Sequence, residues 1–383
     1  MNRFATSNGH LVATTDPVKN AIRSIEVQEN ENEKVFFVEL TKHSKDKLPH
    51  EIARFDEVAV VKKPVSTLHN GHFHNLINPL EYWEAIHQLE QTFRPHKNIP
   101  NSNKLLTELP KITLDSEYLK SKLMELSGAS PIKLGEKKVF LKERYSKEGK
   151  KLAREFLERE YTSLGYQVRE HEFGQFFSGV NFIAEKKGST RSYYMITSHY
   201  DTVRTVGADD DGSGVIASLA IAKALKDMNS EFGIRFVAFD LEERGLKGSK
   251  AYADLLNSQS DLEHMAGLIQ LEMLGWDEDN DRKFHVIDCN ENTSPELTRI
   301  VLETIKHLKL NLSQSSACTN RSDHAPFWRY NKPAIVISQN FFGGDSNPCY
   351  HRSCDNYEKI NLDYLLEIAT ATANAAAKLI RVF

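Results

Sequence analysis

The chain has 383 residues, of which 40% are hydrophobic and 27% are charged, and its formal net charge is −4. This composition is typical of a folded globular protein and argues against a disordered chain or a disulfide-dense scaffold. The length allows one large α/β domain with a smaller appended module. Because no global positive charge is present, we expect neither nucleic acid nor an anionic membrane as a partner.

The N-terminal sequence and the cysteines bear on the compartment of the protein. The first residues, MNRFATSNGHLVATTDP, lack the apolar core of a secretory signal, and no later stretch is long and apolar enough to span a bilayer. Four cysteines occur, none in a CxxC pair: Cys289, Cys318, Cys349 and Cys354. This sparse usage predicts reduced thiols and a cytoplasmic location. A Cys349–Cys354 disulfide is the alternative for that pair, and export by another route stays open.

The first part of the chain, 1–105, predicts a small α+β module. Short apolar runs at 35–40 and 57–61 have strand patterns, and residues 80–93 have helical spacing. The polar run 94–104, RPHKNIPNSNK, has the composition of a linker. An inhibitory prosegment, a lid over the cleft and an oligomerisation element are all open as roles for this module, and the sequence does not decide between them.

Three histidines of this module, His69, His72 and His74, lie close together in LHNGHFHN. They could form a second metal site. A short polar loop without cysteine or carboxylate partners is more often exposed to solvent, so we favour that interpretation.

In the second part of the chain, 106–383, predicted strands and helices alternate. In chain order, the pattern predicts a helix at 147–164, a strand at 192–201, a helix at 213–228, strands at 234–243 and 267–276, a helix at 293–308, a strand at 333–338 and a closing helix at 364–383. This alternation predicts an α/β fold with a mixed, largely parallel sheet that is covered by helices on both faces.

The strand predicted at 192–201 ends in an HxD pair, His199 and Asp201. In a doubly wound sheet, ligands bind outside the carboxyl ends of the strands. An imidazole at such an end can bind a metal ion while a carboxylate holds its second ring nitrogen. Taken alone, the pair fits a solvated strand-end histidine at least as well.

An acidic loop, GADDDGSGV, follows this strand and contains Asp209, Asp210 and Asp211 in front of glycines that permit a tight turn. Capping and the helix dipole explain some acids at a helix N-terminus. Three adjacent carboxylates exceed what capping requires, and a divalent cation would offset their mutual repulsion. The loop therefore favours a metal site.

Two further acidic positions follow or interrupt apolar strands. Glu242 and Glu243 close the strand at 234–243, where one carboxylate can bind a metal ion while its neighbour accepts a proton from water. Glu272 lies inside the apolar run 267–276. A buried carboxylate is unfavourable unless it is paired or bound to a metal.

Together with PCYHRSCDNYEKI near the C-terminus, these segments resemble the co-catalytic zinc aminopeptidase family, which includes bacterial leucyl aminopeptidases and is related to glutamate carboxypeptidase II and glutaminyl cyclases. The resemblance extends from about Ile112 to Phe383. It also includes LKERYSKEGKKLAREFLEREYTSLGYQV, SGVNFIAEKKG and SDHAPFWRYNKPAIVIS. Several separate motifs in the same order make a chance agreement improbable.

The resemblance implies two zinc ions per chain. One zinc would be held by His199, Asp210 and Glu272, and the other by Asp210, Glu243 and His351, so that Asp210 bridges them. Some relatives have an aspartate at the position of Glu272, whose longer side chain should still bind the metal.

The resemblance also implies the remaining roles at this site. Glu242 would be the general base, Asp201 would orient His199, and Tyr350 would stabilise the oxyanion of the tetrahedral intermediate. Asp209 and Asp211 would support the turn. Asp323 and His324 would line the cleft or serve a turn and cap.

The resulting prediction is a metalloaminopeptidase that hydrolyses N-terminal residues from peptides with a free N-terminus. The alternatives are a glutaminyl cyclase-like zinc acyltransferase and a non-catalytic binding protein with a zinc-peptidase fold. The acidic run favours two metals over the single zinc of the cyclases, and the complete ligand set with Glu242 argues against lost activity. Neither the side-chain preference nor the oligomeric state follows from the sequence.

Overall fold

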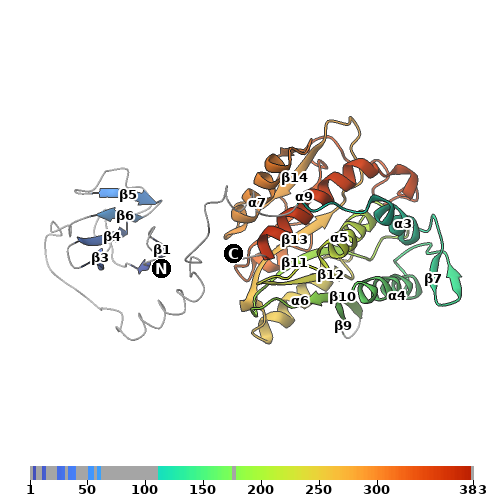
Figure 1. Ribbon diagram of the computed structural model, residues 1–383, viewed down its shortest axis with the longest axis horizontal. Helices are drawn as coiled ribbons and strands as arrows, with labels where there is room; N and C mark the ends of the chain where they lie inside the picture. The colour runs from blue at the N-terminus through green and yellow to red at the C-terminus, as the bar shows by residue number, and fades with distance from the viewer. Residues whose placement is uncertain are drawn as a thin grey trace. The chain divides into compact units, whose positions relative to one another are not determined.

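In the computed structural model, the chain forms two compact units, Met1–Ile99 and Pro100–Phe383 (Figure 1). Residues 111–174 and 178–380 are described in full, and within the first 110 residues only the backbone of six strands is described. The boundary predicted between residues 105 and 106 falls inside the second unit.

The first unit contains two antiparallel sheets. Four strands have the order β3-β4-β6-β5, and two more form a separate pair. The bounds are β1 Arg3–Ala5, β2 Leu11–Ala13, β3 Ser24–Asn30, β4 Glu33–Glu39, β5 Glu51–Phe55 and β6 Val58–Val61. The strands predicted at 35–40 and 57–61 correspond to β4 and β6. The helix predicted at 80–93 and His69, His72 and His74 lie outside the described residues.

The second unit is built on an eight-stranded sheet with the order β15-β14-β16-β13-β11-β12-β10-β9. Strands β12, β11, β13 and β16 run parallel at its centre. On one side β10 is antiparallel to β12 and β9 is antiparallel to β10, and on the other side β14 is antiparallel to β16 and parallel to β15. The bounds are β9 Gln167–Phe173, β10 Gly179–Lys186, β11 Tyr193–His199, β12 Gly233–Phe239, β13 Met265–Glu272, β14 Lys283–Ile287, β15 Ser313–Ser315 and β16 Ala334–Gln339. The prediction of a mixed, largely parallel sheet is confirmed.

Helices cover both faces of this sheet, as predicted. Five helices and one side of the sheet form the larger core, and two further helices form a smaller core on the other side. The first group is α3 Ser116–Leu126, α4 Lys147–Ser163, α5 Gly212–Leu225, α7 Ser294–Leu308 and α9 Leu362–Ile380; the second is α6 Lys247–Ser258 and α8 Ala325–Trp328. A short hairpin, β7 Ile132–Leu134 and β8 Lys137–Val139, stands apart from the sheet. Among the described residues, no helix has the length and apolar character needed to cross a bilayer.

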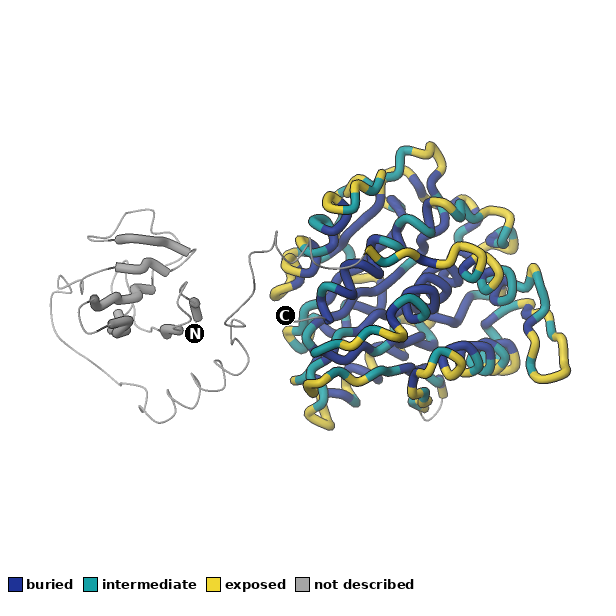
Figure 2. Tube along the Cα trace, in the orientation of Figure 1, coloured by how far each residue is buried: buried dark blue, intermediate teal, exposed yellow. Residues whose placement is uncertain are grey.

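Helix α5 is the most deeply buried of these helices. Its sequence GSGVIASLAIAKAL is apolar on nearly every side, because it is enclosed between the central strands and α9 (Figure 2). The Asp211 carboxylate caps its N-terminus by accepting a hydrogen bond from the Gly214 amide at 3.1 Å. The acidic loop before α5 is therefore held against the carboxyl ends of the parallel strands.

The four cysteines form two disulfides, Cys289–Cys318 and Cys349–Cys354, and no cysteine of the described residues is free. The prediction of reduced thiols is wrong. The fold brings Cys289, after β14, to Cys318, after β15, with their Cα atoms 5.1 Å apart although 29 residues separate them in sequence. The Cys349–Cys354 pair, considered as the alternative, closes the loop that contains Tyr350 and His351.

We expect that no thiol is available in the native protein. A thiol reagent applied in denaturant without reductant should label no cysteine, and all four should be labelled after reduction. Replacing both Cys289 and Cys318 by serine should lower the free energy of unfolding by about 3 to 4 kcal/mol. Replacing both Cys349 and Cys354 by serine should lower it by about 2 kcal/mol, because the shorter closed loop restricts the unfolded chain less. Labelling before reduction would contradict the pairing.

Candidate metal centre

The predicted ligand residues meet at one edge of the central sheet. His199 ends β11, Glu272 ends β13, and Glu243 follows β12. Asp210 lies in the loop before α5, and His351 lies in the loop between β16 and α9. Since β11 pairs in parallel with both β12 and β13, the carboxyl ends of these strands lie side by side, where a doubly wound sheet binds ligands.

The first group consists of His199, Asp210 and Glu272. The Nε2 atom of His199 lies 3.2 Å from Oδ1 of Asp210 and 3.4 Å from Oε1 of Glu272. Two ligand atoms at zinc-binding distance in a tetrahedral site are about 3.4 Å apart. The spacing and the mixture of imidazole and carboxylate therefore fit a zinc ion.

The second group consists of Asp210, Glu243 and His351. The Nε2 atom of His351 lies 3.1 Å from Oδ2 of Asp210 and 3.0 Å from Oε2 of Glu243. The other oxygen of Glu243, Oε1, is buried and has no hydrogen-bond partner in the structure, which is unfavourable unless a ligand contacts it. The two oxygens of Asp210 thus face two different groups, as expected of a bridging carboxylate.

Neighbouring acids hold the loop of Asp210 in place. Asp209 accepts hydrogen bonds from the Gly275 amide and from Asn347, both at 2.8 Å. Asp211 caps α5 and accepts a bond from the His199 amide at 3.1 Å. Both therefore support the turn, as the resemblance implied.

Asp355 supports this loop from a distant part of the sequence. Its carboxylate accepts hydrogen bonds from the amides of Asp209 at 2.8 Å and Asp210 at 3.1 Å. Sequence reasoning assigned Asp355 no role, because 146 residues separate it from Asp209 and no local pattern links them.

Asp201 contacts His199, although chiefly through its main chain. The Nδ1 atom of His199 lies 3.0 Å from the Asp201 carbonyl oxygen and 3.5 Å from the carboxylate. The carboxylate instead accepts bonds from the amides of Glu242 at 3.1 Å and Glu243 at 3.3 Å. Asp201 therefore connects the end of β11 to the turn after β12.

Glu242 and Tyr350 line a small cleft of about 80 Å³ beside the two groups. Burial raises the pKa of Glu242, and neighbouring carboxylates add to this effect. Burial also raises the pKa of Tyr350, so its hydroxyl stays protonated and can donate a hydrogen bond. The ring of Tyr350 stacks on that of His351, with centroids 3.8 Å apart. The apolar part of the cleft comes from Met273, Ile287, Val336, Phe341 and Phe342.

Asp323 and His324 are fully buried and do not line this cleft. Burial lowers the pKa of His324 to about 4, so its ring is neutral, and its Nε2 atom lies 3.0 Å from the Thr319 carbonyl oxygen. Ser322, which sequence reasoning did not select, donates a bond to Oε2 of Glu272 at 2.7 Å. This hydroxyl fixes the orientation of the Glu272 carboxylate.

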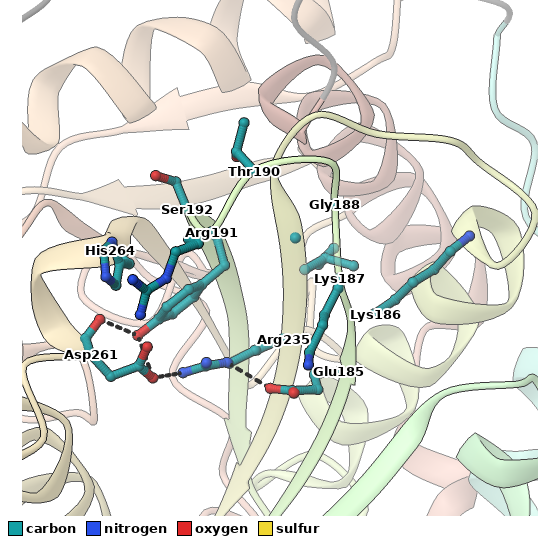
Figure 3. A pocket seen from close by; sticks show the side chains of 13 residues that line it. Glu185, Lys186, Lys187, Gly188, Thr190, Arg191, Ser192, Arg235, Asp261 and His264 are labelled. Carbon is teal, nitrogen blue, oxygen red and sulfur yellow. Dashed lines mark hydrogen bonds and ion pairs between the residues drawn. The ribbon is translucent and has the colours of Figure 1, made fainter.

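A second hollow, of about 340 Å³, lies where β10 ends and β11 and β12 begin, away from the ligand groups (Figure 3). Both of its carboxylates are engaged by Arg235, which binds Glu185 at 2.9 Å and Asp261 at 2.6 Å. Arg235 also stacks on Tyr193 at 3.7 Å. Although this hollow is larger, no candidate ligand group of the described residues lies in it, whereas both groups above border the smaller cleft.

The chain is similar to known proteins over the part that carries these residues. The chain matches peptidase family M28 over residues 181–376, which is about half of its length and includes every proposed ligand. It is 34% identical to aminopeptidase YwaD of Bacillus subtilis over 194 residues, which cover 48% of this chain and 41% of the relative. The chain spans about half the length of the curated relatives that it matches.

Solved structures share the fold. A zinc aminopeptidase from Bacillus subtilis, BSAP, superposes with a TM-score of 0.62 at 16% identity, over 71% of this chain and 97% of that one. A glutaminyl cyclase from Fimbriiglobus ruber gives a TM-score of 0.58 at 18% identity, over 71% and 97%. At these identities the likeness concerns the fold, which aminopeptidases and cyclases have in common.

We expect the metal-free protein to lose stability as the pH rises. Burial raises the pKa of Asp209 to about 6, that of Asp355 to about 7 and that of Asp323 to about 8. Hydrogen bonds with two carboxylates raise the pKa of His351 to about 10. In every case the folded state keeps a proton that the unfolded state has lost, so stability falls as the pH rises toward the folded-state pKa.

The melting temperature of the metal-free protein should therefore be lower at pH 8 than at pH 5. Zinc replaces these protons as the source of positive charge, so it should raise the melting temperature more at pH 8 than at pH 5. Calorimetry at the two pH values, with and without zinc, checks both statements. A metal-free protein that is more stable at pH 8 would contradict them.

Proposed function

The chain belongs to peptidase family M28, and on this premise we propose that it is a zinc metalloaminopeptidase that removes N-terminal residues from peptides. The observation that carries the proposal is Asp210, whose two oxygens face His199 on one side and His351 on the other. Zinc bound by the two groups would polarise the scissile carbonyl and lower the pKa of water.

In this proposal Glu242 moves the protons of the reaction. Its raised pKa makes the carboxylate a better base than an ordinary glutamate near neutral pH. Glu242 takes a proton from the attacking water and then gives it to the leaving amine. The turn after β12 aims it into the cleft, because Asp201 binds the amides of both Glu242 and Glu243.

Tyr350 would supply a hydrogen bond to the oxyanion that develops on the scissile carbonyl. Its protonated hydroxyl is a donor, and the stacking on His351 limits the positions of the ring. The Cys349–Cys354 bond holds the ends of the same loop together.

A glutaminyl cyclase-like activity is the second candidate, since solved cyclases share the fold. The feature that favours hydrolysis is the pair of adjoining ligand groups that share Asp210, which would provide for two metal ions. Release of a terminal residue and loss of ammonia without chain shortening are distinguished by mass.

The compartment is a separate question. The cytoplasmic location remains a prediction from the sequence. The two disulfides favour an oxidising compartment instead, because disulfides are rare among cytosolic proteins.

Glu242→Gln should lower kcat by about 100- to 10,000-fold, because a general base contributes on this scale. The zinc content should stay unchanged, since Glu242 belongs to neither ligand group. The assay follows aminoacyl-anilides and peptides with N-terminal Gln by absorbance and mass, with and without a chelator. Glu148→Gln, an exposed position in the first turn of α4, is the matched control and should keep full activity. Chelator-resistant turnover would contradict the proposal.

Tyr350→Phe should lower kcat by about 100-fold and leave KM nearly unchanged, because the lost hydrogen bond forms in the transition state. Zinc content, measured by atomic absorption, should equal that of the wild type. Tyr330→Phe removes a hydroxyl that binds Asp254 and does not line the cleft, so it serves as the control. An unchanged kcat in Tyr350→Phe would remove Tyr350 from the mechanism.

A further inference from the structure

Among the described residues, Arg144 has the largest fully buried side chain, and it lies just before α4. It precedes the residues that match the peptidase family, 181–376. Its sequence context, LKERYSKEG, contains no metal-binding pattern. A buried arginine is uncommon and indicates a specific set of partners.

All hydrogen-bond acceptors of the Arg144 guanidinium are main-chain carbonyls around the metal centre. Its Nε atom donates to Tyr200 at 2.7 Å, Nη1 donates to Val206, and Nη2 donates to Gly207 at 2.9 Å. Tyr200 follows His199 directly, and Gly207 lies three residues before Asp210. One planar group thus connects the strand end that carries one ligand with the loop that carries the bridging ligand.

The main chain of Arg144 contacts the same segment. Its amide donates to Oγ1 of Thr202 at 3.0 Å, and its carbonyl oxygen accepts from the Thr202 amide at 3.2 Å. Gly207 has a φ of 56°, and a Cβ atom there would lie 2.2 Å from the Asp210 carbonyl oxygen. The loop therefore has little freedom to shift while Arg144 is in place.

The charge of Arg144 also matters for the site. Burial lowers its pKa, while Asp355, Asp211 and Asp210 oppose this effect in that order. No carboxylate forms a hydrogen bond with the guanidinium among the described residues, so these acids act on it through space. The result is one fixed positive charge beneath a cluster of carboxylates that repel one another.

We propose that Arg144 is a positioning residue that fixes the loop of Asp210 relative to His199 and thereby sets how tightly the chain holds its metal pair. The inference rests on the proposed function, because it concerns the same two ligand groups. A lysine keeps the charge but cannot reach three carbonyls at once, and a methionine of similar length keeps neither the charge nor the donors.

The test is the affinity for zinc, measured by competition with a coloured chelator on purified wild type, Arg144→Lys and Arg144→Met. Residues that orient metal ligands typically change metal affinity by about 10- to 100-fold when they are replaced. We expect a loss of this size in Arg144→Met and a smaller loss in Arg144→Lys. The matched control is Arg235→Met, because Arg235 is also largely buried but binds Glu185 and Asp261 away from the metal centre (Figure 3).

The melting temperature of each metal-free variant separates positioning from general destabilisation. A loss of zinc affinity in Arg144→Lys with a melting temperature at or above that of metal-free Arg235→Met supports the inference. Thr202→Ala keeps the arginine and removes the hydroxyl that accepts from the Arg144 amide and donates to the Thr205 carbonyl, so a measurable loss of zinc affinity there supports the same anchoring of the loop. Wild-type zinc affinity in Arg144→Lys and Thr202→Ala overturns it. A wild type that binds no zinc overturns the proposed function itself.

Discussion

The concentration of negative charge around Asp210 is the constraint on which the rest of the site depends. The three aspartates of one loop, the glutamates after β12 and at the end of β13, and Asp355 all lie at one edge of the sheet. Their mutual repulsion would open this edge if the fold did not supply compensation. Main-chain amides, two histidines and Arg144 supply part of it, and metal ions in the two ligand groups would supply the rest.

The acids that stabilise this edge of the fold also hold the proposed metal ligands in place. Asp209, Asp211 and Asp355 accept hydrogen bonds from main-chain amides, so they hold the loop and leave Asp210 facing the histidines. The ligand residues come from strand ends and from loops that connect the sheet to its helices. Rigid strands therefore set the spacing of one group, and the Cys349–Cys354 loop carries His351 to the other.

Much of the fold could be predicted because its central elements have strong local patterns. The parallel strands β11, β12, β13 and β16 are continuous apolar runs, and the helix that follows β11, α5, begins at the Asp211 cap. The strands on either side of the parallel centre, β9, β10, β14 and β15, were not predicted. Strand β9 is largely polar and β15 has three residues, so neither produces a clear periodic signal.

The acidic and histidine residues at the predicted strand ends indicated a metal site, and the resemblance of several motifs to a known family implied the particular ligand set, whose members the structure brings together. Only the tertiary structure could reveal the residues that act across long separations. The Cys289–Cys318 bond, the contact of Asp355 with the acidic loop and the three carbonyls that surround Arg144 all depend on how distant segments pack together. A hydrogen bond or a disulfide between such segments leaves no local pattern in the sequence, since it requires only that two atoms meet after folding.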